Sequence, residues 1–209
     1  MQAILFDFNG TLSDDEGVQC QIYRELFAEH GRPLREEMYF AELAGLSDPE
    51  IVERWLGPGH PATAAVLEGR VRRFHERTGD GSTVPAHVRE ALLAVNGRAR
   101  LAVVSGAARS EVEEVARAAG IDVFELIVAA EDVTRGKPDP EGYLRALELL
   151  GVPAVEAVAF EDTPPGVASA KAAGVYCVAV LGTVSEERLS DADEVVPRVD
   201  AALLERLLA

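Results

Sequence analysis

The sequence of 209 residues has few cysteines, few lysines and no long apolar run. Its two cysteines, Cys20 and Cys177, lie far apart in apolar surroundings, so we expect two buried reduced thiols and neither a disulfide nor a nucleophile. No run approaches the roughly 20 apolar residues that cross a bilayer. A strand-like segment begins at once and leaves no room for a signal peptide. We therefore expect a cytoplasmic protein.

Positive charge is also scarce. The 20 lysines and arginines face 36 aspartates and glutamates, which gives a formal net charge of −16 at pH 7. Phosphate backbones and anionic membrane surfaces repel such an acidic chain at long range. We therefore expect neither nucleic acid nor a membrane as a partner, and the sequence makes no prediction of the oligomeric state.

Five short, continuous apolar runs predict buried β-strands. Runs that are continuous rather than alternating are typical of strands covered on both faces, as in a parallel sheet. Helical patterns lie between the later runs, and each ends at a glycine. This alternation predicts an α/β fold with a doubly wound parallel sheet. The predicted strands are residues 3–6, 101–104, 126–129, 157–160 and 175–180, and the clearest helices are residues 111–119, 141–150 and 166–173.

A helical insertion is predicted after the first strand, because the gap before the second strand is far longer than one crossover helix needs. Within it, Ser47 and Glu50 fit a capping box. The sequence thus predicts a core domain of residues 1–14 and 81–209 and a small helical cap domain of residues 15–80, hinged at two points so that it can close over the core. The predicted cap helices are residues 18–30, 35–44, 48–56 and 62–77.

Polar residues follow four of the five predicted strands. In an open parallel sheet, ligands bind beyond the carboxyl ends of the strands, so we expect these residues at one edge. Acidic side chains gathered there repel one another unless a cation lies among them. Their oxygen-only character favours a hard divalent ion, Mg²⁺ first, completed by water and a substrate phosphate. The residues are Asp7, Asn9, Gly10 and Thr11 after the first strand, Ser105 and Gly106 after the second, Lys137 after the third, and Glu161 and Asp162 after the fourth.

Lys137 is unusual because 18 of the 20 basic residues are arginines and only Lys171 is another lysine. A lysine just beyond a strand end suggests a need for a compact point charge. A phosphate oxygen or a nucleophilic carboxylate would be its natural partner. The alternative is a surface lysine in a proline turn.

Four segments, taken in order, resemble the four motifs of the haloacid dehalogenase-like (HAD) hydrolase superfamily. The insertion resembles the helical cap of that family, and the resemblance runs from Ile4 to about Gly182. Any single motif is weak evidence, but four in order with compatible spacings are strong. The segments are residues 6–12 (FDFNGTL), 104–106 (VSG), 136–140 (GKPDP) and 160–166 (FEDTPPG).

The resemblance implies a role for each motif residue. It makes Asp7 the nucleophile that forms an aspartyl-phosphate, and it makes Lys137 the charge that neutralises Asp7 and the transferring group. Thr11, Ser105, Gly106 and Lys137 are expected to bind the substrate, with the Ser105 hydroxyl and the Gly106 N–H on phosphoryl oxygens. The Mg²⁺ ligands are expected to be Asp7, Glu161, Asp162 and the backbone carbonyl of Asn9.

Asn9 departs from the pattern, because phosphatases and phosphomutases of this family usually carry an aspartate there as acid and base. An amide has no titratable proton near neutral pH. Loss of this acid and base should lower the rate by about 10² to 10⁴, which raises the activation barrier by roughly 3 to 5 kcal/mol. Three interpretations follow: a slow phosphatase, an enzyme whose acid and base come from elsewhere, or a trap for the phosphorylated state. Asp14, Asp15 and Glu16 follow the first motif and are candidate substitutes, but we expect them to be solvated hinge residues.

The function we expect is Mg²⁺-dependent hydrolysis of a small phosphorylated metabolite through Asp7, slow because of Asn9. The loop at residues 43–47 most resembles the β-phosphoglucomutase-like branch of the family. In the mutase an arginine follows the corresponding serine and grips a second phosphate, whereas Asp48 follows here. Two alternatives stay open: a non-catalytic relative that binds a phosphate ester or a partner, and a sugar phosphomutase, which Asp48 disfavours.

Overall fold

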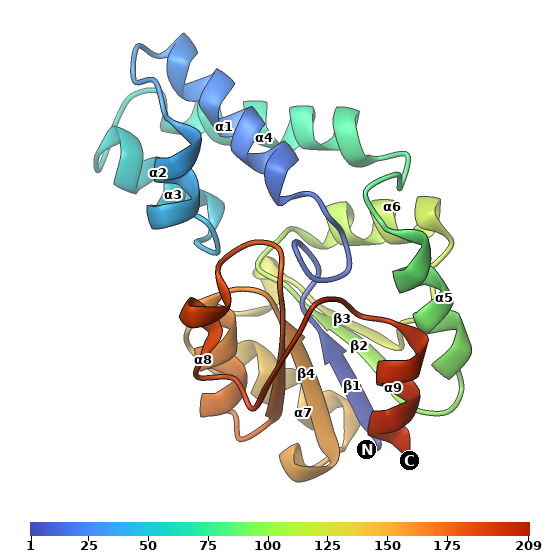
Figure 1. Cartoon of the computed structure of the whole chain (residues 1–209). Coiled ribbons are helices and arrows are strands. Elements are labelled where there is room, and N and C mark those ends of the chain that lie inside the picture. The colour runs from blue at the N-terminus through green and yellow to red at the C-terminus, as the bar shows by residue number, and fades with distance from the viewer.

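The computed structural model describes residues 1–209 and confirms the α/β fold. Six parallel strands form one sheet in the order β3-β2-β1-β4-β5-β6, which is the order of a doubly wound fold. Helices flank the sheet, and a separate group of helices lies beyond the carboxyl ends of the strands (Figure 1). The strands are β1 (Ala3–Phe6), β2 (Arg100–Val104), β3 (Leu126–Val128), β4 (Ala157–Glu161), β5 (Tyr176–Val180) and β6 (Glu194–Val196).

The sequence predicted five of these strands to within one residue at each end. It missed β6, which has only three residues and lies at the edge of the sheet. Glu194 opens this strand and pairs with Arg206 at 2.5 Å. A strand so short, with a charged residue in it, leaves no apolar run in the sequence, so its place is fixed by pairing with β5.

Side chains of the central strand alternate between two cores. Ile4 and Phe6 of β1 pack into one core with α5, α6 and α9, whereas Ala3 and Leu5 pack into the other with α7 and α8. All four of these β1 residues are fully buried, which explains the continuous apolar run. The core helices are α5 (Ala86–Val95), α6 (Arg109–Ala119), α7 (Glu141–Leu150), α8 (Pro164–Ala172) and α9 (Ala201–Leu208).

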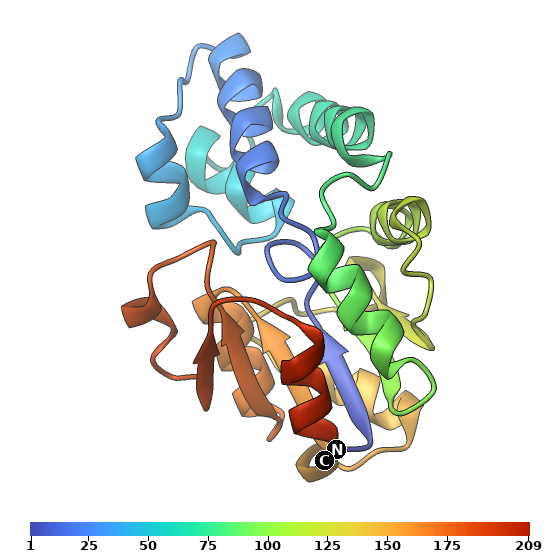
Figure 2. The ribbon, with the colours of Figure 1, turned by 45° about the vertical axis from the view of Figure 1, so that its right-hand side comes forward.

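Four helices form the inserted unit, and two chain segments join it to the sheet-bearing part (Figure 2). Its interior is aromatic: Tyr23 stacks on Phe27 and on Tyr39, and Phe27 stacks on Trp55. The predicted capping box of α3 is present. These helices agree with the predicted cap, whose domain boundaries stay a prediction. The helices are α1 (Glu16–Glu29), α2 (Glu36–Glu42), α3 (Asp48–Leu56) and α4 (Thr63–Thr78).

Short 3₁₀ turns complete the chain at Ala130–Asp132, Ala154–Glu156 and Glu186–Leu189. Both cysteines are buried and free, as expected. None of the helices has the length and apolar character needed to span a bilayer.

Candidate active site

Asp7 follows the carboxyl end of β1, where the strand order reverses between β1 and β4. It is 7% exposed, and its Oδ1 accepts a hydrogen bond from Nζ of Lys137. The same Nζ lies 2.7 Å from Oε1 of Glu161. Burial alone would lower the pKa of Lys137, but the two carboxylates outweigh burial and raise that pKa. Lys137 is therefore a charged lysine held inside the site and not a surface residue of a turn.

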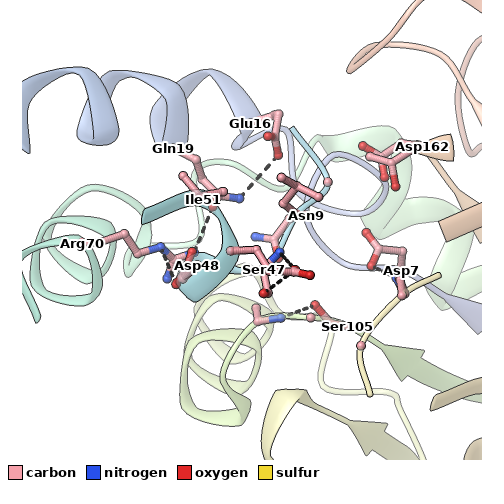
Figure 3. A pocket seen from close by; sticks show the side chains of 18 of the residues that line it. Asp7, Asn9, Glu16, Gln19, Ser47, Asp48, Ile51, Arg70, Ser105 and Asp162 are labelled. Atoms are coloured by element: carbon pink, nitrogen blue, oxygen red, sulfur yellow. Dashed lines mark hydrogen bonds and ion pairs between the residues drawn. The ribbon is translucent and has the colours of Figure 1, made fainter. Parts of the chain in front are cut away.

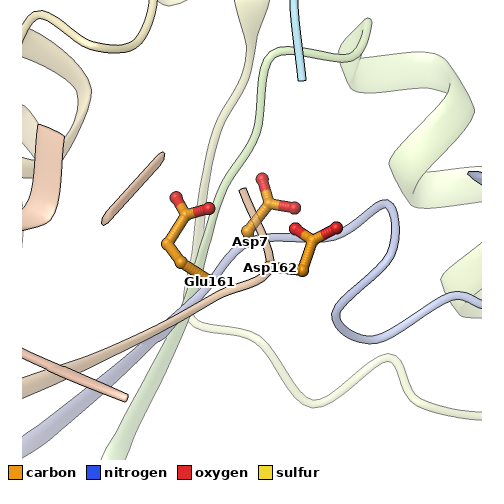
Figure 4. Close-up of side chains that lie close together, drawn as sticks. All are labelled: Asp7, Glu161 and Asp162. Carbon is orange, nitrogen blue, oxygen red and sulfur yellow. The ribbon is translucent and has the colours of Figure 1, made fainter. Parts of the chain in front are cut away.

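The parallel register brings three carboxylates together. β1 pairs with β4 so that Phe6 lies opposite Phe160, and therefore Asp7 leaves its strand beside Glu161 and Asp162. One oxygen from each carboxylate lies within 4.8 Å of the other two, and all three residues are buried. Figure 4 shows Asp7 between Glu161 and Asp162.

The three carboxylates carry more negative charge than Lys137 can neutralise. Burial raises the pKa of Glu161 to about 7 even with this lysine beside it. Burial, Asp7 and Glu161 together raise the pKa of Asp162 well above its usual value, and burial raises the pKa of Asp7 against the effect of Lys137. Oε2 of Glu161 is buried without a hydrogen-bond partner, since Lys137 and Tyr143 both contact Oε1. Hard oxygen donors with an unpartnered atom and excess negative charge fit a divalent cation.

Two hydroxyls orient Asp162. Oγ1 of Thr11 donates to its Oδ1 at 3.3 Å, and Oγ1 of Thr183 donates to its Oδ2. Gly10 has a φ of +76°, and a Cβ at this position would lie 2.0 Å from Oδ2 of Asp162, so glycine is required. Thr11 does not line the cavity that holds Asp7. We expected Thr11 to bind the substrate; the structure instead places it as a partner of Asp162.

Ser105 and Gly106 follow β2, the neighbour of β1, and line the same cavity as Asp7 and Lys137. Oγ of Ser105 accepts a hydrogen bond from the N–H of Ala107 at 3.1 Å, which fixes the turn before α6. Hydroxyl and backbone N–H groups in front of a helix are suitable donors for an anion. The structure thus brings these residues together where the sequence placed them, and their contacts with a substrate stay a prediction.

Asn9 faces a buried carboxyl. Its Nδ2 donates to Oδ2 of Asp15 at 2.9 Å, and burial raises the pKa of Asp15 to about 8. Glu16 is 9% exposed and lines the cavity together with Asn9. Only Asp14 is exposed, so the expectation of solvated hinge residues was wrong for Asp15 and Glu16. The reason is tertiary: α1 begins at Glu16, and Tyr39 of α2 packs over it and donates to its carboxylate.

The cap supplies the opposite wall of the cavity, as Figure 3 shows. Arg70 of α4 is 2% exposed, and its Nε lies 3.1 Å from Oδ2 of Asp48. Its guanidinium also pairs with Glu111 of α6 and donates to Gln19 at 2.9 Å. The hydroxyl of Tyr23 donates to Asp48 at 2.6 Å. Arg70 is therefore neutralised by two carboxylates of the protein itself.

Sequence reasoning missed Arg70, although a signal for it exists. Val66, Arg70 and Phe74 are spaced by four residues and are all buried on one face of α4. An arginine at a position that the pattern reserves for an apolar side chain needs buried partners. It finds one in Glu111, on a core helix, so the ion pair connects the cap to the core at the edge of the cavity.

The sequence matches a known family over most of its length. The family model described as haloacid dehalogenase-like hydrolase matches residues 4–180. Validoxylamine A 7'-phosphate phosphatase of Streptomyces hygroscopicus subsp. limoneus is 32% identical to this chain, and the alignment covers 90% of each protein. Protein CbbY of Rhodobacter capsulatus is 31% identical, with 97% of this chain and 95% of CbbY covered.

Solved structures agree with these matches. CbbY from Rhodobacter sphaeroides in complex with phosphate superposes with a TM-score of 0.85 at 29% identity, covering 97% of this chain and 96% of that chain. An aspartate-to-asparagine variant of the same protein, in complex with xylulose-(1,5)bisphosphate, superposes equally well. The resemblance inferred from the four motifs is therefore confirmed.

Proposed function

Because the chain belongs to the haloacid dehalogenase-like hydrolases and has relatives that are named as phosphatases, we propose that it hydrolyses a small phosphomonoester. In this reaction Mg²⁺ is the cofactor and Asp7 is the nucleophile. One observation carries this proposal: Asp7 contacts Lys137 and lies within 4.8 Å of Glu161 and Asp162, two buried carboxylates that are suited to hold a cation with it. A nucleophilic carboxylate that attacks a phosphate dianion needs such positive charge around it.

The metal would be held by Asp7, Glu161 and Asp162 through their side chains and by Asn9 through its backbone carbonyl. The unpartnered Oε2 of Glu161 and the excess negative charge of the cluster support this assignment. When bound, the ion offsets the charge of the phosphate as the nucleophile approaches.

Two displacements at phosphorus complete the reaction. In the first, a carboxylate oxygen of Asp7 forms a bond to phosphorus, the ester oxygen leaves, and that oxygen takes up a proton. In the second, water attacks the same phosphorus, the bond to Asp7 breaks, and the water loses a proton. Ser105 and the N–H of Gly106 hold the phosphoryl oxygens, while Lys137 stays in contact with Asp7 and balances its charge.

The cap side of the cavity favours a substrate with a single phosphate and several hydroxyls. Glu16, Asp48 and Glu50 line this side, and Arg70 is already neutralised by Asp48 and Glu111. A second phosphate would therefore meet carboxylates without a free cation. Validoxylamine A 7'-phosphate, which gives one relative its name, carries a single phosphate. The CbbY variant, by contrast, is in complex with a sugar bisphosphate, so bisphosphates belong in the test.

Phosphate release from a panel of phosphomonoesters, sugar bisphosphates and 4-nitrophenyl phosphate tests the proposal. We expect turnover with Mg²⁺, a fall of at least about 10²-fold when a chelator removes the metal, and recovery when Mg²⁺ returns. Monophosphates should exceed bisphosphates in kcat/KM. Chelator-insensitive release would contradict the proposal. Calorimetric binding of an ester without turnover over hours would instead support the non-catalytic alternative, and isomerised sugar phosphate would support the mutase.

A further inference from the structure

The proposed hydrolysis needs a group that donates and accepts a proton, and none of the residues assigned so far does so. The leaving oxygen must gain a proton in the first displacement, and the attacking water must lose one in the second. Asn9 can do neither, because its amide does not titrate near neutral pH. A group that replaces it has to face the cavity, since the leaving oxygen lies on the cap side of the phosphate that Asp7 attacks.

Three of the four carboxyl and phenol groups on the cap side of the cavity are committed elsewhere. Asp48 accepts from Tyr23 and pairs with Arg70. Glu50 accepts from the N–H and the hydroxyl of Ser47 in the capping box of α3, at 2.9 and 2.5 Å.

Tyr39 is the third group that is committed elsewhere. Its hydroxyl donates to Glu16, and burial and the neighbouring Glu16 raise its pKa well above the usual value. Asp15 does not line the cavity, and its Oδ2 accepts from Asn9. Neither group is therefore placed to exchange a proton with a substrate in the cavity.

Glu16 is the group that is left. Its Oε1 is anchored by the hydroxyl of Tyr39 at 2.7 Å, while Oε2 has only the amide of Gln19 at 3.5 Å. One oxygen is thus fixed and the other is free to exchange a proton with a substrate. In the view of Figure 3, Asn9 lies between Glu16 and Asp7, and all three residues line the same cavity.

We propose that Glu16 is the general acid and base of this enzyme in place of Asn9, which rests on the proposed phosphatase function. As the bond from Asp7 to phosphorus forms and the ester bond breaks, Glu16 gives its proton to the leaving oxygen. As water then attacks phosphorus and the bond to Asp7 breaks, the Glu16 carboxylate takes a proton from that water. The cycle returns Glu16 to its protonated form, so protons and electron pairs balance.

The surroundings of Glu16 suit both roles. Burial, together with the charge of Asp7, raises its pKa to about 7 against the effect of the hydrogen bond from Tyr39. Charged groups face it from the other packed elements as well: Arg70 of α4 lowers the pKa, and Asp48 of α3 raises it. A carboxyl that titrates near neutral pH can both donate and accept a proton during turnover.

Four proteins test this proposal: the native chain, Glu16→Gln, Asn9→Asp and the double variant. With an alkyl phosphate, we expect Glu16→Gln to lower kcat by about 10²-fold or more. With 4-nitrophenyl phosphate, whose leaving group needs no proton, the same variant should release a fast burst of one nitrophenolate per site and then turn over slowly, because the second displacement still lacks a base. In the Asn9→Asp background, Glu16→Gln should cost less than about 3-fold, since the introduced carboxyl takes over the proton.

The controls separate this proposal from the one on which it rests. Glu42→Gln makes the same change at an exposed position of α2 that does not line the cavity, and it should leave both substrates unaffected. Equal kcat in the native chain and Glu16→Gln, or the same loss in both backgrounds, would overturn the role of Glu16. A large loss in Asp15→Asn with none in Glu16→Gln would also overturn it. Absence of Mg²⁺-dependent turnover in the native chain would instead refute the phosphatase function.

Discussion

Replacing Asp7 by asparagine should lower kcat by about 10⁴-fold or more, because an amide cannot form the phosphorylated intermediate and is a poorer ligand for Mg²⁺. The effect should be equally large for 4-nitrophenyl phosphate and for alkyl phosphates, since the first displacement fails with both. Steady-state phosphate release in saturating Mg²⁺ measures it. Asp14→Asn, at the exposed position of the hinge, is the matched control and should keep its activity.

The same variant separates a loss of chemistry from a loss of folding. Asp7 is one of three buried carboxylates that face a single lysine, so its neutral replacement removes repulsion from the cluster. Without metal, the melting temperature of Asp7→Asn should therefore equal or exceed that of the native chain, and Mg²⁺ should stabilise it less. A variant that folds normally and keeps more than about a tenth of the activity would show that Asp7 is not the nucleophile.

Replacing Lys137 by methionine should cause the largest combined loss of stability and activity. Lys137 is 14% exposed, and its Nζ is the cation in contact with Asp7 and Glu161. Removing one partner of a buried ion pair typically costs about 3–5 kcal/mol, because the remaining charge is left buried and unpaired. Loss of this charge beside the reacting phosphate should lower kcat by about 10³-fold. Denaturant unfolding without metal and steady-state kinetics measure the two effects.

The stability loss in Lys137→Met should depend on pH in a defined direction. Burial already raises the pKa of Glu161 to about 7, and loss of the lysine raises it further. A carboxyl with a raised pKa in the folded state binds its proton more tightly there than in the unfolded chain, so stability falls as pH rises between the two pKa values. The difference in the free energy of unfolding between the variant and the native chain should thus be smaller at pH 5 than at pH 8.

Lys171 provides the matched control, because it is the other lysine of the chain and pairs with Asp193 at 39% exposure. Exposed pairs contribute about 0–1 kcal/mol, so Lys171→Met should be nearly neutral. Similar losses for the two lysine variants, or a gap that widens at low pH, would contradict the account of the buried cluster.

The sequence predicted those parts of the fold and the site that depend on local residue pattern and on position along the chain. Continuous apolar runs predicted the buried strands, and the polar residues after the first and fourth runs predicted the meeting of Asp7 with Glu161 and Asp162. Lys137 was predicted from its rarity and its place beyond a strand end. These features follow from strand termini alone, because parallel strands bring their carboxyl ends to one edge.

Features that depend on contacts between different elements could not be predicted in this way. Asp15 and Glu16 have the sequence of a solvated hinge, and only the packing of α2 over α1 buries them. In the sequence, Arg70 cannot be told from the less buried arginines that follow it in the same helix, and its partner Glu111 lies far away in the chain. Thr11 lies within the first motif, yet its hydroxyl donates to Asp162 and not into the cavity. In each case the partner comes from another element.

The phosphorylated form of Asp7 tests the central claim most directly. Acid quenching during turnover of an alkyl phosphate, followed by proteolysis and mass spectrometry, should find one phosphoryl group on the peptide that contains Asp7. Hydroxylamine should remove the group, as expected for an acyl phosphate, and Asp7→Asn should not acquire it. Rapid turnover by the native chain with no such species at any quench time, or a hydroxylamine-resistant phosphoryl group on another residue, would contradict the account.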